Sequence, residues 1–89
     1  MSGSGFVAGI KYTKPADCSA ADVVVTPGAV CVINSNLTTN GVVKLTYANG
    51  TTGVIPVAAM QYVAVNDFRQ VWQTGTTAGI QANIIVGYG

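Results

Sequence analysis

The residue types that carry most enzyme and metal chemistry are scarce in this chain. Its 89 residues include no His and no Glu, and its three Asp residues are scattered along the sequence. The general base and metal ligand that proteins use most often is therefore missing. A carboxylate pair could come only from Asp17 and Asp22, which fall in one predicted loop. In such a loop Asp is better suited to forming turns and caps than to catalysis.

The two cysteines, Cys18 and Cys31, are thirteen positions apart. A disulfide between them would need an oxidising compartment and suitable geometry. The start of the chain shows no export signal, so we expect two reduced, inert thiols. Two Cys without any His cannot complete a four-ligand zinc site within one chain. The sequence therefore predicts neither a metal nor another cofactor.

The motifs that mark common active sites are also missing. The chain has no Gly-x-Ser-x-Gly elbow, no phosphate-binding Gly-Lys-Thr and no dinucleotide-binding fingerprint. The stretch TGTTAG at 74–79 is similar to a glycine-rich phosphate loop, but it lacks the Lys and a predicted following helix. A hairpin turn explains it better. We therefore predict that the protein is not an enzyme.

The composition favours short strands. Val occurs fourteen times and Thr ten times, and both residues favour strands, while eleven Gly and three Pro interrupt the chain every few residues. We expect an all-β fold, a small antiparallel sandwich or barrel of about six to eight short strands. It would form a single domain over residues 1–89, with 1–5 as a flexible segment and 6–89 as the β core.

The clearest local signal is a hairpin around Asn49-Gly50, the pair best suited to a type I′ turn. Pro56 in its returning arm indicates an edge position or a bulge. At residues 58–65 we expect a strand, or a short helical turn that leads into a strand. We expect residues 87–89 to form a pliant end. The other expected elements are strands at 6–12, 23–25 and 29–34, a loop at 14–22, and a terminal hairpin formed by strands 68–75 and 80–88.

The aromatic residues raise the question of a binding platform. In the strand predicted at 68–75, Phe68 and Trp72 alternate with Arg69, so Arg69 should face the opposite side. Stacking on nucleic acid needs basic residues around the rings, so we interpret Phe68 and Trp72 as core or interface anchors. Arg69 would pair with Asp67 or a neighbouring subunit, or stay solvated. The candidate interface residues are Tyr62, Phe68, Arg69, Trp72 and Tyr88.

The surface is expected to be almost neutral. Charged residues make up 8% of the chain and hydrophobic residues 49%, whereas about 25% of an average domain is charged. Polarity comes from Thr, Asn, Ser, Gln and Gly, whose neutral groups lose their water at a lower cost than ions do. Such a surface suits burial against other chains. An ordinary neutral monomer, as some secreted β proteins are, is the alternative.

The charge pattern also excludes some partners. A net charge of +1 does not supply the clustered Lys and Arg that bind nucleic acid. No basic amphipathic stretch or apolar run of about 18 residues indicates a membrane. Residues 1–15, MSGSGFVAGIKYTKP, lack the long apolar run of a signal peptide. We expect the chain to stay where it is made or to leave inside a particle.

The order of elements in residues 41–89 resembles a known family. VVKLTYANG is followed by GVIPVAAMQYVAV and then by VWQTGTTAGIQANIIVGY. This is similar to the decoration and spike-base proteins on the heads of phages and phage-like gene transfer agents. There a hairpin precedes an Ile-x-Pro-Val-type strand, and a TGTTA turn precedes an aliphatic strand and an aromatic residue. The matching elements are Ile55-Pro56-Val57, Thr74–Ala78 and Ile84–Tyr88.

The resemblance implies a non-enzymatic virion protein, a capsid decoration (cement) or spike-base subunit made in the host cytoplasm and located on the phage head surface. Its partners would be the major capsid protein and further copies of itself, with a trimer favoured and a pentamer possible. Two alternatives stay open. One is a phage tail or baseplate β-module. The other is a small monomeric carbohydrate-binding β-barrel that would use an exposed aromatic, Trp72 or Tyr62.

Overall fold

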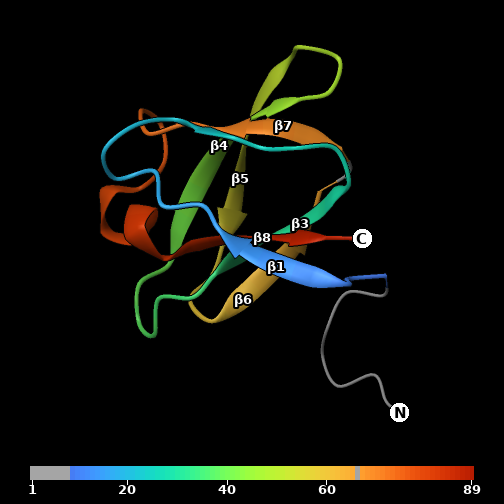
Figure 1. The fold of residues 1–89 in the computed structure, drawn as a ribbon. Helices are drawn as coiled ribbons and strands as arrows, with labels where there is room; N and C mark the ends of the chain where they lie inside the picture. The colour runs from blue at the N-terminus through green and yellow to red at the C-terminus, as the bar shows by residue number, and fades with distance from the viewer. Residues whose placement is uncertain (1–8, 66) are drawn as a thin grey trace.

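A computed structural model describes residues 9–65 and 67–89 (Figure 1). Two four-stranded antiparallel sheets form, sheet A in the order β1-β8-β3-β6 and sheet B in the order β2-β7-β4-β5. This confirms the expected all-β fold as a small antiparallel sandwich. The elements in chain order are β1 (Tyr12–Pro15), β2 (Val23–Val24), β3 (Ala29–Asn34), β4 (Gly41–Tyr47), β5 (Thr52–Val57), β6 (Gln61–Ala64), β7 (Phe68–Val71), the 3-10 helix η1 (Ala78–Asn83) and β8 (Ile84–Tyr88).

A single hydrophobic core lies between the sheets. Sheet A contributes Val32 and Val86, and sheet B contributes Leu45, Phe68 and Val71, all of them buried. The central strands β8, β3, β7 and β4 bury residues on the inner side of the pleat and turn the other side outward, because successive side chains of a strand point to opposite faces. In the edge strand β1 all four residues are exposed.

The hairpin of β4 and β5 forms where expected, but its turn is of another type. The Gly50 N–H donates to the carbonyl of Tyr47 at 2.9 Å, and Gly50 has a φ of 89°. Asn49 does not share a positive φ, whereas a type I′ turn needs one at both central residues. The loop is therefore the three-residue kind, Ala48-Asn49-Gly50, and its tip projects beyond β7 in Figure 1. Pro56 lies on β5, an edge strand, as predicted.

The strict alternation expected along 68–73 is wrong. In the pairing with β4, Val71 stands opposite Leu45 and Phe68 stands opposite Tyr47, so β7 holds one extra residue between these pairs. Such a bulge changes the side to which the following residues point. As a result Phe68 and Val71 are both fully buried, and Phe68 does not share a face with Trp72.

The expected terminal hairpin of 68–75 and 80–88 is also wrong. β7 pairs with β2 and β4 in sheet B, whereas β8 pairs with β1 and β3 in sheet A. Residues 72–83 carry the chain from one sheet to the other and contain η1, which is anchored by the fully buried Ile80. The hydroxyls of Thr76 and Thr77 accept hydrogen bonds from the β4 amides of Lys44 (3.1 Å) and Val42 (2.9 Å). The TGTTAG stretch thus continues the ladder of sheet B instead of closing a hairpin.

The ends of the chain differ from expectation as well. Residues 1–8 lie outside the described residues, including the expected flexible segment 1–5 and part of the strand expected at 6–12. β1 begins only at Tyr12 and includes Lys14 and Pro15, which the sequence placed in a loop. Pro15 is tolerated because β1 is an edge strand. The pliant end expected at 87–89 is instead held, since Tyr88 is buried in β8 and the Gly89 N–H donates to the carbonyl of Gly28 at 2.9 Å.

Candidate protein-docking surfaces

The outer face of sheet A carries a row of apolar side chains. Residues directly opposite each other on neighbouring strands point to the same face of a sheet, so the strand register defines the row. Ile85 of β8 stands opposite Pro15 on one side and Ile33 on the other, and Ile33 stands opposite Tyr62 of β6. None of the four is charged, and Tyr62 is 40% exposed. We call these four residues, Pro15, Ile85, Ile33 and Tyr62, the apolar row.

Next to the apolar row, the same face is closed at one end. Gly87 stands opposite Cys31, and a Cβ added to Gly87 would lie 2.5 Å from the Cys31 sulfur and 3.2 Å from Ile10. Ile10 therefore packs over this end of sheet A and helps to bury Cys31, which lies outside the main core cluster. The surface open to a partner is the apolar row itself.

The outer face of sheet B is also poor in charge. Val24 of β2 is 82% exposed and Val54 of β5 is 56% exposed. Lys44 is the one cation that the register places on this face, directly opposite Val54. The other side chains that the register places here are Gln70 of β7, Val42 and Thr46 of β4, and Thr52 and Pro56 of β5.

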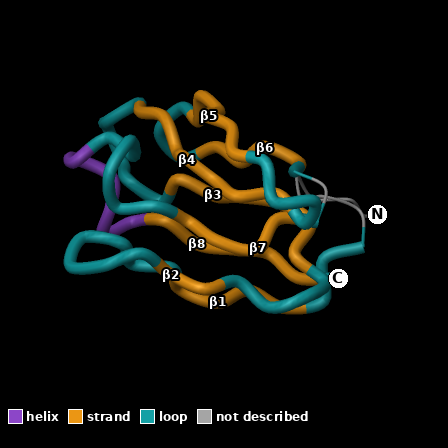
Figure 2. Tube along the Cα trace, turned by 90° about the horizontal axis from the view of Figure 1, so that it is seen from above, coloured by secondary structure: helices purple, strands orange, loops and turns teal. Residues whose placement is uncertain are grey.

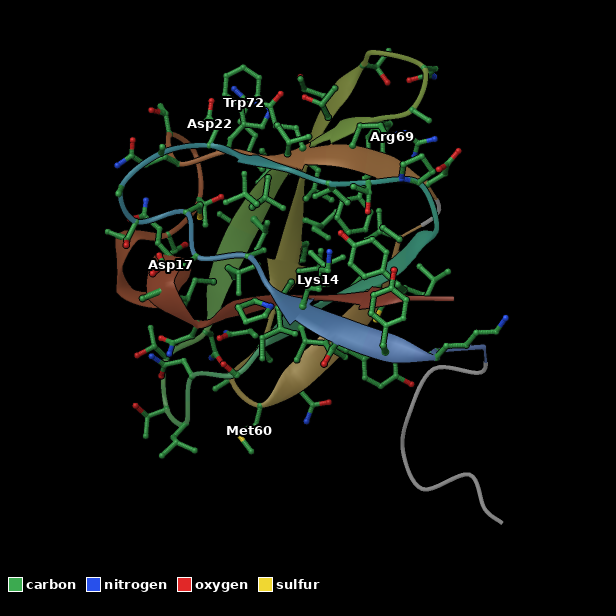
Figure 3. The ribbon with its side chains drawn as sticks, in the orientation of Figure 1. Lys14, Asp17, Asp22, Met60, Arg69 and Trp72 are labelled. Atoms are coloured by element: carbon green, nitrogen blue, oxygen red, sulfur yellow. The ribbon has the colours of Figure 1, made fainter. Side chains whose placement is uncertain are left out.

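Trp72 lies over this outer face, and its ring contacts the ammonium group of Lys44. Its indole N–H donates to the hydroxyl of Thr46 at 2.8 Å, and the Lys44 ammonium stands 4.3 Å from the centre of the ring. A cation so placed over an indole ring is attracted by the negative face of its π-system. Trp72 is thus half-buried and positioned by β4. Figure 3 shows its side chain on the outer side of the β7 ribbon.

The other candidate interface residues divide between surface and core. Arg69 forms an ion pair with Asp67, one of the arrangements left open by the sequence, and both side chains are partly exposed. Phe68 is fully buried and Tyr88 is 4% exposed, with its ring stacked 5.0 Å from that of Tyr12. These two residues belong to the core and offer almost no surface to a partner. The candidates that do offer surface to a partner are Tyr62, Arg69 and Trp72.

A depression of about 350 Å³ lies beside the hairpin tip, lined by Tyr47, Ala48, Asn49 and Asp67. The Ala48 N–H donates to the carbonyl of Asp67 at 2.8 Å, which holds the tip against the start of β7. Asp67 has a φ of 54°, a left-handed conformation that few residues other than Gly adopt. The positive charge of Arg69 balances the negative charge of the Asp67 carboxylate in their ion pair.

Of the two aspartates of the predicted loop, Asp17 has the turn-forming role expected of it, whereas Asp22 makes long-range hydrogen bonds instead. Ser19 donates its N–H and its hydroxyl to Asp17, at 2.9 and 2.6 Å, and these hydrogen bonds lower the pKa of that carboxyl. Asp22 accepts hydrogen bonds from the side chain of Gln70 and the backbone of Gln73, which ties the loop to β7. Each carboxylate is engaged separately, so the two do not form an acid–base pair.

The cysteines are free, as expected, and both are buried. Burial raises the pKa of Cys18 and of Cys31 above the ordinary value of 9.0. A thiol that stays protonated is a poor nucleophile and a poor metal ligand. Over residues 9–65 and 67–89, no group of three or more His, Cys, Asp or Glu residues could hold a metal ion. In the same residues no helix is long and apolar enough to cross a membrane.

Several residues that lie on the surface were not predicted from the sequence. Ile33 and Ile85 stand in runs of apolar residues, AVCVIN and IIV, which have no period of two. Such runs indicate strands that are apolar on both faces, and this was the signal that could have identified the apolar row. The exposure of Val24 and Val54 had no comparable signal, because it depends on which strands lie at the edges.

Comparison with protein-family models, with curated proteins and with solved structures finds no match to this chain.

Proposed function

We propose that this protein is a non-enzymatic structural subunit of a virion head, a decoration (cement) or spike-base protein that binds the shell of major capsid protein. The observation that carries the proposal is the apolar row on the outer face of sheet A. The outward side of an antiparallel sheet in a two-layer fold is ordinarily polar where it meets water. Here it presents Ile33, Ile85, Pro15 and Tyr62 across all four strands.

The chemistry of the row suits a permanent contact with another protein. Four strands spaced about 4.8 Å apart make the row roughly 15 Å wide, and its members would lose water without leaving a buried charge unpaired. The buried centre of an interface is likewise depleted of charged residues and enriched in aromatic ones such as Tyr62. A subunit that binds in this way stabilises a shell mechanically, by bridging neighbouring subunits.

Sedimentation with capsid shells tests the proposal. The probe is a shell assembled from the major capsid protein of the same genome. We expect the wild-type protein to sediment with these shells and to saturate at a fixed ratio. Tyr62→Asp places a carboxylate at the β6 end of the apolar row. The affinity of this variant for shells should fall about tenfold or more, equivalent to about 1.4 kcal/mol or more.

Val24→Asp is the matched control, because it places the same charge on an exposed position of the opposite sheet. We expect it to bind shells as the wild type does. A wild-type protein that stays in the supernatant at every concentration would refute the proposed function. Equal losses in both variants would show that the shell contact does not lie on sheet A.

The depression beside the hairpin tip favours a second candidate, the carbohydrate-binding module. A tyrosine ring, an amide and a carboxylate line it, through Tyr47, Asn49 and Asp67, and such groups suit the apolar faces and hydroxyls of a neutral sugar. A titration with a glycan panel, followed by amide NMR, should then shift the resonances of residues 47–49. Unchanged resonances across the panel would eliminate this candidate.

A further inference from the structure

The outer edge of β5 carries backbone groups that no other strand of the described chain pairs. β5 is the last strand of sheet B, next to β4 only. On β4, the backbone groups of Val42 and Lys44 bond toward the β7 side, to Thr77 and Trp72 among others. The Tyr47 N–H bonds in the opposite direction, toward the returning arm of the hairpin, and donates to the Thr51 carbonyl at 2.7 Å. Alternate residues of β4 therefore face β5, and alternate residues of β5 face away from it.

This alternation identifies the free groups of the edge. Gly53, opposite Leu45, and Ile55, opposite Val43, face β4. Thr52, Val54 and Pro56 consequently turn their backbone groups outward. Pro56 has no N–H to offer, so it limits the number of donors at one end of the strand. The edge thus presents the N–H groups of Thr52 and Val54 and the carbonyl groups of Thr52, Val54 and Pro56.

The edge lacks the charges that usually keep edge strands apart. Natural edge strands are commonly blunted by short length, by charged residues or by Pro, and of these features β5 has only Pro56, near its C-terminal end. The other edges of the two sheets show such features, because β1 contains Lys14, β2 has two residues and β6 has four. β5 has six residues, TGVIPV, none of them charged. In Figure 2 it lies on the margin of the molecule opposite β1 and β2, with no other strand of sheet B outside it.

The one cation near the edge is directed away from it. Lys44 stands opposite Val54 on the neighbouring strand, yet its ammonium lies 4.3 Å from the Trp72 ring, on the β7 side of β4. Two copies brought together along β5 would place their Lys44 backbones three strand spacings apart, about 14 Å. Because each Lys44 ammonium points away from β5, the two ammonium groups would be further apart than the two backbones. This separation exceeds the Debye length of about 8 Å at physiological salt. Charge repulsion therefore does not oppose pairing of like edges.

We propose that β5 binds β5 of a second copy of this chain, antiparallel across a two-fold axis, and joins the two B sheets into one continuous sheet. An antiparallel pair of identical edges is self-complementary, since each outward N–H of one copy meets an outward carbonyl of the other. About four backbone hydrogen bonds can form, and Val54 of each copy covers the other. The contact uses sheet B and does not rest on the proposed shell contact of sheet A. Its symmetry is two-fold, so it would link two subunits or two higher oligomers and would not itself create a trimer.

Native mass measured by light scattering over a concentration series tests this contact. An edge contact is small compared with the roughly 1,200 Å² of a stable interface, so we expect weak association that needs protein concentrations up to about 1 mM. The wild-type mass should rise from one chain of 9.1 kDa toward twice that value. Val54→Lys brings two cations together across the axis and should weaken association at least tenfold.

Val24→Lys is the matched control. Val24 is an exposed Val on the same outer face, and its backbone also turns outward, because the neighbouring Val25 amide bonds to Arg69 of β7. We expect Val24→Lys to associate as the wild type does, and circular dichroism should show that both variants are folded. Amide hydrogen exchange in the wild type gives a second readout. Protection of Thr52 and Val54 should increase with concentration, while that of Gly53 and Ile55 should not.

Several results would overturn the inference. A wild-type protein that stays monomeric at about 1 mM would do so, as would association that Val54→Lys leaves unchanged. Equal weakening by Val24→Lys would show association through the whole outer face or through another edge. Tyr62→Asp separates this proposal from the shell contact, because it should weaken shell binding and leave the two-fold pairing intact.

Discussion

Asn34 is the one fully buried amide side chain of the described residues, and it links the two sheets. It lies in β3 of sheet A, and its amide group donates to the carbonyl of Val57 in β5 of sheet B at 3.2 Å. It also donates to the carbonyl of Thr39 at 2.9 Å, and its oxygen accepts from the Asn36 N–H at 3.0 Å. We predict that Asn34→Ala is among the most destabilising single substitutions in this chain.

The magnitude follows from these three hydrogen bonds. Each contributes about 1 kcal/mol net, and a buried carbonyl left without a partner costs about 1–3 kcal/mol. Val57 is buried, whereas Thr39 is partly exposed and can recover a bond to water. The expected loss is therefore about 3 kcal/mol. A chain of this length has a free energy of unfolding of about 4–13 kcal/mol, so the variant should lose between a quarter and most of its stability.

Urea unfolding followed by the fluorescence of the single tryptophan measures this loss. The slope with urea should stay unchanged and the midpoint should fall. Asn40→Ala is the control, because the Asn40 side chain is exposed and accepts one hydrogen bond, from the Ala59 N–H at 2.9 Å. It should cost no more than about 1 kcal/mol. If Asn34→Ala costs no more than Asn40→Ala, the hydrogen bond between the sheets does not stabilise the fold.

Three further predictions concern packing, titration and the surface. Gly87→Ala places a methyl group 2.5 Å from the Cys31 sulfur and should cost about 1–3 kcal/mol in urea unfolding; Gly79→Ala, whose methyl would be 3.4 Å from its nearest neighbour, should be close to neutral. Burial raises the pKa of Cys18 and of Cys31 in the folded state, so their contribution to stability is complete below the ordinary thiol pKa of 9.0 and is lost as the pH rises through the folded-state pKa. The wild type should therefore lose more stability between pH 8 and pH 10 than the variant with both cysteines replaced by Ala, and an equal loss would contradict this. Lys44→Met removes the cation from the tryptophan ring and should lower stability by about 0.5–1 kcal/mol while shifting the fluorescence emission; an unchanged spectrum would argue against the contact.

Much of the fold follows from local patterns in the sequence. The run AVCVIN predicts β3, and the alternation of Val43, Leu45 and Tyr47 around Asn49-Gly50 predicts the β4–β5 hairpin, because a strand's side chains repeat every two residues and Asn-Gly favours a turn. The structure confirms both elements. The turn type differs, because the strand twist and register select a three-residue loop that the dipeptide alone does not specify.

The candidate surface was less predictable. Tyr62, Arg69 and Trp72 are accessible to some degree, whereas Phe68 and Tyr88 are buried. Phe68 turns inward because of a bulge in the pairing of β7 with β4, and Tyr88 is covered because β8 lies between β1 and β3. Both causes are contacts between segments that are far apart in the sequence, so no local pattern in residues 68–72 or 84–88 carries them.

The sequence by itself determined that this protein is built of short strands, that its surface is nearly neutral and that its thiols and carboxylates are few. These properties depend on composition and on local spacing, which are complete in the chain. Only the tertiary structure decided that strands 68–71 and 84–88 belong to different sheets, and that Ile33 and Ile85 lie side by side on an outer face. It also decided that, within residues 9–65 and 67–89, no strand pairs with the outer edge of β5. A strand specifies which residues share one of its sides, but its neighbours in the sheet decide which side is buried and which edge stays unpaired.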